Sequence, residues 1–419
     1  MHPLLAWSLL AAIDLGTAQN AQTELQAMCD RDRGRLWGRS VCGPIVFAEH
    51  GTRDAVQFVD GVAMPTRVPD SIGIANTAVD WDGRRWTMVV WPLPKGTIAR
   101  RALLAHESFH RIQNELGLPM SNPANAHLDG AEGRYWMRME WRALARALAS
   151  RDDGAVADAL AFRAKRRALA KNAAEEERAL EMNEGLAEYT GYALAVPHAR
   201  ERVATLVTKL AEAEKSETFA RSFAYASGPA WGTLLEMRDP RWNNRCHPER
   251  RARELGVRGG RDGVARPTRP GPSLDARDDR CDFGTLIRVR SASAARASEY
   301  GGDAVLAEEQ ERATRKRELM ARLQATFIDG PVLAIPLVKM QYTFNPDRVQ
   351  PFGERGSVYE SLEMRDAWGT IVVASGGALI TSDYQRLIVP ANGDGYTLTL
   401  NEGWKIVAGA REGDKTLTR

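Results

Sequence analysis

Short apolar runs alternate with turn residues in the N-terminal part of the chain, which is the pattern of strands joined by turns. Residues 44–48 and 55–59 are two such runs, and a glycine-containing turn follows each of them. A third run, at 86–91, ends at two prolines, which cannot donate hydrogen bonds to a sheet. We therefore expect residues 19–95 to be β-rich.

The spacing of apolar residues changes to the 3.6-residue period of a helix after residue 96. Thr97 is suited to cap the start of this helix, and Gly117 followed by Pro119 is suited to end it. The predicted helix has one apolar face, which consists of Ile98, Ala102, Ala105, Phe109, Ile112 and Leu116.

Helical patterns continue through the middle of the chain and give way to strands near its end. Residues 131–195 and 200–220 have helical spacing, and residues 303–327 read as one long charged helix. After residue 329, apolar runs punctuated by Gly, Asp and Asn return. The expected fold class is α+β, with a β-rich N-terminal part, a helical core and a C-terminal β-rich domain.

A short apolar stretch at residues 4–13 is followed by small residues at 16–18. This pattern is typical of a secretory signal peptide with cleavage near Ala18, and it predicts a periplasmic or secreted protein. The alternative is a buried N-terminal helix, because no Lys or Arg precedes the apolar run and Asp14 lies at its end. No other stretch approaches about 18 uninterrupted apolar residues, so we expect no membrane span.

Cys29 and Cys42 are close enough in the sequence to bridge a small loop, and export to an oxidising compartment would permit that disulfide. Two unpaired thiols in a cytoplasmic protein are the alternative. Neither pair of cysteines in the chain has C-x-x-C spacing, so the sequence does not favour zinc bound by cysteine.

Residues 245–282 differ in composition from the rest of the chain. They contain ten arginines and no lysine, with many Gly, Pro and Asp residues and little apolar periodicity. They read either as an irregular, solvated loop or as a stretch translated out of frame from a GC-rich gene. The interspersed acidic residues, and a net charge of only +3 for the whole chain, give no support for a nucleic-acid partner.

The candidate chemistry is centred on His106 and His110, which form an HExxH motif within the first predicted helix. Residues four apart lie on the same side of a helix, so both imidazoles can bind one zinc ion. Glu107 lies beside them, where it can take a proton from a metal-activated water. The alternative is an ordinary helix with two partly exposed histidines.

A second predicted helix, at 172–195, offers a third ligand. Glu184 and Glu188 occur there in the segment NEGLAEY, among Gly, Leu, Ala and Tyr residues that would make a poor exposed surface. A buried carboxylate without a partner is costly, and a metal ion offsets that cost. The alternative is a solvated acidic stripe, because Glu177 and Glu181 continue along the same side.

Together, HESFH and NEGLAEY resemble the gluzincin zinc metallopeptidases, which include thermolysin-like enzymes and a large aminopeptidase branch. In that superfamily the HExxH helix supplies two histidines and the first Glu of an NExxx helix supplies the third ligand. The resemblance implies Zn²⁺ bound by His106, His110 and Glu184, with Glu107 as general base. Whether Glu188 is the third ligand instead of Glu184 stays open.

The resemblance covers residues 97–238 and departs from the aminopeptidases in two ways. Residues 111–183 lie between His110 and Glu184, which is a longer interval than in that branch. The Gly-x-Met-Glu-Asn element that grips a free substrate amine is missing, and a predicted strand at 85–91 occupies its place. Aminopeptidase specificity is therefore not supported, although an edge strand at that position would pair with an extended peptide.

Tyr225 lies in a Y-x-x-G element before a predicted apolar helix at 233–237. In the aminopeptidase branch a similar tyrosine donates a hydrogen bond to the oxyanion, so the resemblance implies that role for Tyr225. The alternative is a buried tyrosine that closes a loop against the following helix.

These patterns predict a zinc-dependent hydrolase, in the first place a peptidase that acts on a peptide or protein substrate. A non-catalytic envelope binding or assembly protein on a metallopeptidase-like fold is one alternative, and a zinc hydrolase of an ester or a non-peptide amide is another. The sequence leaves the oligomeric state open. The predicted organisation is a signal peptide at 1–18, a β-rich part at 19–95, a helical core at 96–242, an irregular Arg-rich segment at 243–300, a helix at 301–328 and a β domain at 329–419.

Overall fold

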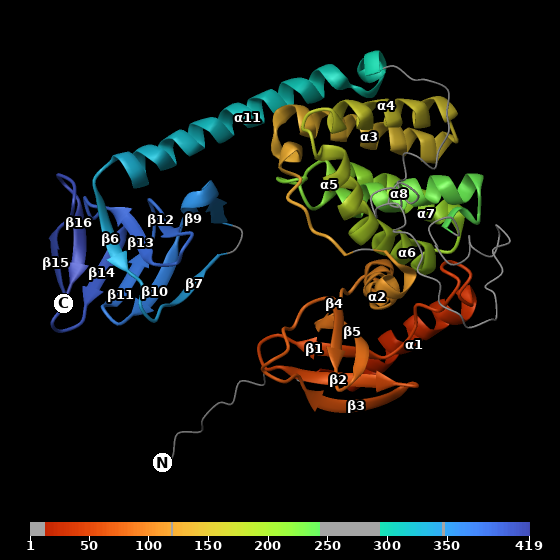
Figure 1. Ribbon diagram of the computed structural model, residues 1–419, viewed down its shortest axis with the longest axis horizontal. Helices are drawn as coiled ribbons and strands as arrows, with labels where there is room; N and C mark the ends of the chain where they lie inside the picture. Colours follow the sequence, from red (N-terminus) through yellow and green to blue (C-terminus); the bar gives the residue numbers. More distant parts are fainter. Residues whose placement is uncertain (1–12, 119, 244–293, 346–347) are drawn as a thin grey trace, which may run out of the picture. The chain divides into compact units, whose positions relative to one another are not determined.

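A computed structural model describes residues 13–118, 120–243, 294–345 and 348–419 (Figure 1). The chain divides into two compact units, Met1–Glu309 and Gln310–Arg419. Helices and mixed sheets are both present, so the expected α+β class is confirmed. The unusual composition at 245–282 lies outside the described residues.

Among the described helices, none combines the length and the apolar character that a bilayer crossing requires.

A five-stranded sheet forms the first part of the first unit. Its order is β3-β2-β1-β5-β4, with β1 and β5 parallel and the other neighbours antiparallel. The apolar runs that predicted strands correspond to β1, β2 and β5. The bounds of the strands are β1 Ile45–Glu49, β2 Asp54–Val59, β3 Val62–Arg67, β4 Thr77–Trp81 and β5 Arg84–Trp91.

The edge of this sheet nearest the HExxH helix is β4, whereas the sequence predicts an edge strand at 85–91. That prediction is wrong, because β5 pairs with β1 on one side and with β4 on the other. Asp82 and Gly83 both have positive φ angles, which is the geometry of a two-residue hairpin turn between β4 and β5. The weakly apolar residues of β4 gave no strand signal of their own.

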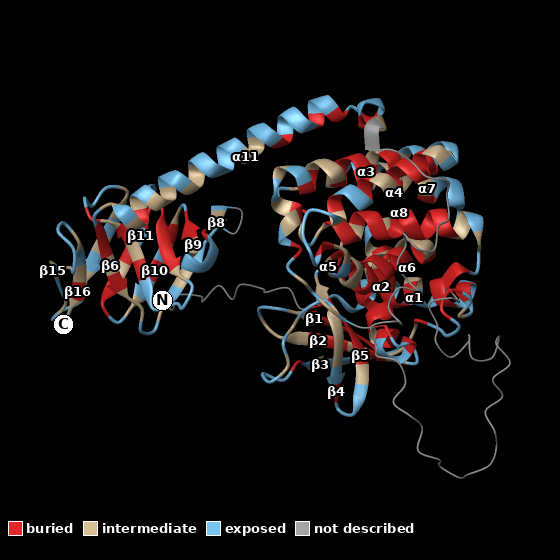
Figure 2. Cartoon of the chain, turned by 45° about the horizontal axis from the view of Figure 1, so that its top comes forward, coloured by how far each residue is buried: buried red, intermediate tan, exposed pale blue. Residues whose placement is uncertain are grey.

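Helices make up the rest of the first unit and are largely buried along α2, α6 and α8 (Figure 2). The predicted apolar helix at 233–237 starts much earlier, at Phe223. The bounds are α2 Thr97–Gln113, α3 Ala131–Ser150, α4 Asp153–Arg167, α5 Ala173–Leu180, α6 Leu186–Ala195, α7 Ala199–Ala213 and α8 Phe223–Arg238, with short 3₁₀ turns η1 Asn114–Leu116, η2 Ala126–Asp129 and η7 Ala294–Tyr300.

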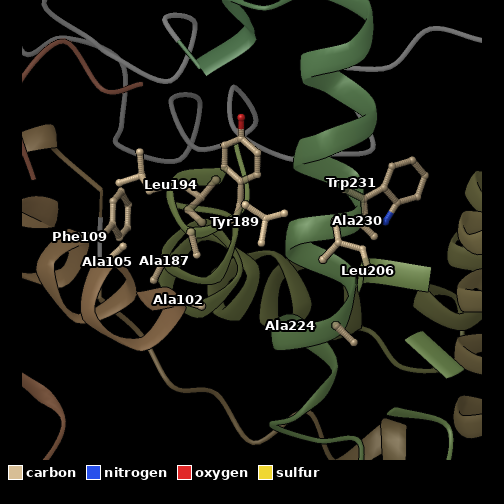
Figure 3. Packing of buried hydrophobic residues seen from close by; sticks show 14 of the residues in the cluster. Ala102, Ala105, Phe109, Ala187, Tyr189, Leu194, Leu206, Ala224, Ala230 and Trp231 are labelled. Atoms are coloured by element: carbon tan, nitrogen blue, oxygen red, sulfur yellow. The ribbon is translucent and has the colours of Figure 1, made fainter. Parts of the chain in front are cut away.

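Small residues bring α6 very close to α2, and bring the residue just before α6 very close to α8 (Figure 3). A Cβ atom on Gly191 would lie 2.7 Å from the carbonyl oxygen of Ala102 in α2. A Cβ atom on Gly228 in α8 would lie 2.4 Å from the Cα atom of Gly185. Such distances exclude any side chain, so glycine at these positions sets the separation between the helices. The backbone that precedes α6 is thereby held against the helix that carries HExxH.

The N-terminal helix α1, Leu15–Asp32, is capped by the Asp14 side chain, which accepts a hydrogen bond from the Thr17 amide. Ala18 is fully buried, so the predicted cleavage point lies inside a helix that packs in the core. Residues 1–12 lie outside the described part of the chain, and the signal peptide at 1–18 stays a prediction. Cys29, near the end of α1, forms a disulfide with Cys42, as one of the two alternatives predicts.

The second unit begins within the long charged helix α11, Gly302–Gln324, and is otherwise built from two sheets. Their orders are β14-β11-β10-β7 and β15-β16-β6-β13-β12-β9-β8. Residues from both sheets share one apolar core around Trp368, so the predicted C-terminal β-rich part is present. The bounds are η8 Ala325–Asp329, β6 Val332–Pro336, β7 Gln341–Phe344, β8 Val349–Pro351, β9 Gly356–Tyr359, β10 Leu362–Asp366, β11 Gly369–Val373, β12 Ala378–Thr381, β13 Arg386–Pro390, β14 Tyr396–Leu400, β15 Lys405–Ala408 and β16 Lys415–Thr418.

Candidate metal centre

Helix α2 carries the HExxH residues into the interior of the first unit. His106, Glu107 and His110 are each only 4 or 5% exposed, so the alternative of two partly exposed histidines is wrong. The N-cap of α2 is Gly96, which has no side chain that could cap the helix, and Thr97 is the first helical residue. This one-residue shift leaves the spacing of the motif unchanged.

The second predicted helix contains a break in its regular period. Between α5 and α6, residues Glu181–Gly185 form a single π-helical turn, in which the Leu186 amide donates to the Glu181 carbonyl. Such turns insert one extra residue and are frequent at functional sites. Glu184 lies within this turn and is buried. The spacing of apolar residues predicts only a uniform helix, so the turn was not visible in the sequence.

Three potential ligand atoms converge where α2 meets the π turn. The two Nε2 atoms of His106 and His110 are 3.1 Å apart. The Oε2 atom of Glu184 lies 3.3 Å from the first of these nitrogens and 3.5 Å from the second. Ligands bound to zinc at about 2.0–2.1 Å with tetrahedral angles are separated by about 3.3 Å. The three atoms therefore have the spacing of one face of a zinc tetrahedron.

The opposite nitrogen of each imidazole has an acceptor of its own. Nδ1 of His106 lies 2.7 Å from Oε2 of Glu188, and Nδ1 of His110 lies 2.7 Å from Oε1 of Gln113. If each Nδ1–H donates to its acceptor, each Nε2 keeps a lone pair directed at the convergence point. Metal-binding histidines are commonly oriented in this way. In this geometry Glu188 supports His106, and Glu184 faces both imidazoles.

Glu107 lies beside the convergence point without belonging to the close triangle. Its Oε1 atom is 4.0 Å from Nε2 of His106, although both histidines and Glu107 each offer a ligand atom within 4.8 Å of one another. Its buried Oε2 atom has no hydrogen-bond partner among the described residues. Burial raises the pKa of Glu107, and the neighbouring histidines oppose this effect. A carboxylate of this kind is a suitable proton acceptor.

The electrostatics of the centre favour positive charge. Burial disfavours a protonated His106, but hydrogen bonds to Glu184 and Glu188 outweigh it and raise the pKa of His106 to about 10. Burial also opposes the ionisation of Glu184, yet the two histidines and Tyr225 hold the pKa of Glu184 far below its usual range. The same carboxylates that favour positive charge on His106 would favour a divalent metal in place of the proton on Nε2, because both interactions stabilise positive charge at this nitrogen.

Tyr225 lies in the first turn of α8 and not in a loop, so its predicted setting is wrong. Its ring stacks on the imidazole of His106 with centroids 5.6 Å apart. Burial, together with a hydrogen bond between its hydroxyl group and Glu184, raises the pKa of Tyr225. The tyrosine therefore reaches the centre, where it contacts one proposed ligand and lies over another.

A cleft of about 500 Å³ opens at the centre. The cleft contains all six candidate residues that the sequence singles out. It also contains cationic and amide groups that sequence patterns did not reveal. Lys209 donates to Glu188 at 2.9 Å, and a nitrogen of Arg221 lies 3.6 Å from Oε1 of Glu184. The residues that line the cleft are Asn76, Thr77, Ala99, Ala102, Leu103, His106, Glu107, His110, Met120, Asn122, Asn183, Glu184, Glu188, Tyr192, Lys209, Arg221 and Tyr225.

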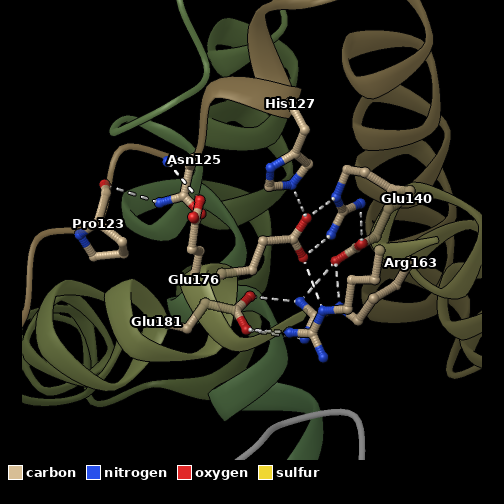
Figure 4. A network of polar contacts seen from close by, with 10 residues as sticks. Pro123, Asn125, His127, Glu140, Arg163, Glu176 and Glu181 are labelled. Carbon is tan, nitrogen blue, oxygen red and sulfur yellow. Dashed lines mark hydrogen bonds and ion pairs between the residues drawn. The ribbon is translucent and has the colours of Figure 1, made fainter. Parts of the chain in front are cut away.

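A buried cluster of ion pairs fixes the segment that precedes Glu184 (Figure 4). One nitrogen of Arg163 lies 2.6 Å from Glu181, the first residue of the π turn, and 2.8 Å from Glu140 in α3. Arg166 pairs with Glu140 and with Glu177, the latter at 2.7 Å. The alternative of a solvated acidic stripe is therefore wrong: Glu177 and Glu181 are buried in ion pairs, and Glu184 and Glu188 line the cleft.

Comparison with known proteins adds no family to this geometry: no family model, no curated protein and no solved structure matches the chain.

Proposed function

We propose that this protein is a zinc-dependent hydrolase of the gluzincin type, and that it acts as a peptidase. The observation that carries the proposal is the convergence of two Nε2 atoms and one carboxylate oxygen at separations of 3.1–3.5 Å in a buried site. His106, His110 and Glu184 would hold the metal. Two histidines and one glutamate are an established ligand set for catalytic zinc, and they leave a fourth position open.

Zinc is supported by the chemistry of the donors as well as by their spacing. Imidazole nitrogens with one carboxylate suit zinc better than calcium or magnesium, which prefer all-oxygen sites. When bound, zinc supplies Lewis acidity, which makes water a stronger nucleophile near neutral pH and polarises a carbonyl group. The remaining steps belong to side chains of this protein.

Glu107 is the proposed general base. Its unpartnered Oε2 atom would accept the proton that water loses as it attacks the substrate carbonyl, and would then pass it to the leaving nitrogen. The pKa of Glu107 is raised by burial and so lies closer to neutral pH than that of an exposed glutamate. The Tyr225 hydroxyl would donate a hydrogen bond to the oxygen that becomes negative during the attack.

A peptide substrate is supported by the strand beside the cleft. Asn76 and Thr77, at the start of β4, line the cleft together with α2. Among the described strands, β4 pairs with β5 alone, so its other side offers backbone groups to an extended chain. An edge strand next to the proposed metal is where an extended peptide would lie with a carbonyl group near Glu107.

Export of the protein is part of the same proposal. The Cys29–Cys42 disulfide is the supporting observation, since such bonds persist in oxidising compartments. We propose a periplasmic or secreted location on this ground and on the predicted signal peptide. A thiol assay on protein purified from its native host, with and without denaturant, should find these two cysteines oxidised; two reactive thiols would contradict the proposal.

The substitution Glu107→Gln tests catalysis separately from metal binding. We expect the variant to keep its zinc and to lose about 10²- to 10⁴-fold in peptide hydrolysis, since a general base contributes that much. Metal content and turnover of a mixed peptide library would be measured on the same preparation. Zinc-loaded wild-type protein without hydrolysis of any peptide, ester or amide would favour the binding-protein alternative, and turnover of esters alone would favour a different hydrolase.

A further inference from the structure

Arg221 is a cation in the cleft that the proposed reaction does not use. It lies in the turn two residues before α8, and its side chain is 64% exposed although it lines the cleft. Lys209, the other cationic lining residue, is held by Glu188 at 2.9 Å and lies over the ring of Tyr192. Arg221 therefore offers more free donor groups to a bound molecule than Lys209 does.

The position of Arg221 relates it directly to the proposed reaction. Oε1 of Glu184 faces Arg221 at 3.6 Å, whereas Oε2 of the same carboxylate faces the two imidazoles. Arg221 also hydrogen-bonds to the hydroxyl group of Tyr225. A single carboxylate thus separates the guanidinium from the convergence point. One residue of an extended peptide spans about 3.3–3.6 Å, so a group on or next to the reacting residue would reach Arg221.

The balance of charge in the cleft favours an anionic group. Its lining contains the carboxylates of Glu107, Glu184 and Glu188 and the cations Lys209 and Arg221. With a divalent metal bound, these charged groups and the metal would sum to one net positive charge. Of the two cationic side chains, Arg221 is the more exposed. Guanidinium groups bind carboxylates through two parallel hydrogen bonds, which adds specificity to charge attraction.

We propose that Arg221 is a specificity residue that binds a substrate carboxylate close to the scissile bond. This inference rests on the proposed hydrolase function and names its substrate class: peptides that carry a carboxylate within about one residue of the cleaved bond. The carboxylate comes either from the C-terminus of a short peptide or from an acidic side chain, and the two sources are distinguished experimentally.

The test compares matched peptides on the zinc-loaded protein. One pair differs only in a free or an amidated C-terminus, and a second pair carries Glu or Gln next to the scissile bond. We expect kcat/KM to favour one acidic member by about tenfold, and we expect the preferred pair to identify the source. Arg221→Met should reduce that ratio to nearly one, Arg221→Lys should retain part of it, and Arg200→Met, an exposed arginine outside the cleft lining, should leave it intact.

A binding measurement separates failure of this inference from failure of the proposed function. The same peptides would be titrated calorimetrically into the Glu107→Gln protein with Arg or Met at position 221. A preference for the acidic peptide that Arg221→Met abolishes supports the inference, whether or not the wild-type protein hydrolyses these peptides. Equal affinity for acidic and neutral peptides, or a preference that survives Arg221→Met, overturns it even if hydrolysis is confirmed.

Discussion

Glu184 and Glu188 are the same residue type one helical turn apart, yet their surroundings assign them different tasks. The carboxylate of Glu184 faces Nε2 of both histidines, whereas that of Glu188 lies between Nδ1 of His106 and Lys209. The HExxH motif and an acidic partner were predictable from sequence, because both depend on short-range spacing. The choice between the two glutamates was not, because it depends on the π turn and on how α6 approaches α2.

Gln113 is a residue whose role is visible only in the structure. Its Oε1 atom lies 2.7 Å from Nδ1 of His110 and so fixes which nitrogen of that ring carries the proton. Gln113→Leu should lower zinc affinity by about 10- to 100-fold, because loss of such an acceptor typically has this effect. Competition with a coloured chelator would measure it. The matched control is Gln22→Leu, which replaces a buried glutamine on a different helix, α1. Equal zinc affinity of the two variants would contradict the prediction.

At the scale of elements, the π turn joins the proposed ligand to a buried ionic cluster. Glu181 begins the turn and pairs with Arg163, which also holds Glu140 on α3. Sequence period predicted one continuous helix at 172–195, and helical structure does extend over most of that range. The turn and its anchors were not predictable, since they depend on charges that approach from separate helices.

The Arg163→Met substitution tests this anchor. It leaves Glu140 and Glu181 without their shared cation in the interior, and we expect the free energy of unfolding to fall by about 3–5 kcal/mol. Urea unfolding of the metal-free protein would measure the change. Arg238→Met removes an arginine whose partner, Asp153, is mostly exposed, and it should cost at most about 1 kcal/mol. Equal losses in the two variants would refute the anchoring role.

The same cluster predicts how stability depends on pH. Burial alone would raise the pKa of Glu177, but the charge of Arg166 and hydrogen bonds from His127 and Arg166 hold it well below the ordinary value of 4.5. A carboxyl group whose pKa falls on folding contributes stability that is complete above its unfolded pKa and is lost as the pH falls through its folded pKa. Unfolding free energy, measured with excess chelator, should therefore decrease below about pH 4.5. Glu177→Gln should weaken that decrease, and an unchanged pH profile would contradict this assignment.

At the scale of the whole molecule, the chain forms two units with separate cores. The α+β class and most long helices were predictable because their apolar periods are regular. The order of strands in the N-terminal sheet was not predictable. It depends on the parallel pairing of β1 with β5, and these two strands are far apart in the sequence. That pairing places β4 at the edge beside the cleft, and it therefore decides where a peptide would bind.

The most direct test of the account is the zinc content of purified wild-type protein beside Glu184→Ala and Glu188→Ala, measured by elemental analysis after dialysis. We predict close to one zinc per wild-type chain, almost none after Glu184→Ala, and weakened but detectable binding after Glu188→Ala, whose carboxylate supports His106. Absence of zinc from the wild type, or full zinc content after Glu184→Ala, would contradict the proposed centre.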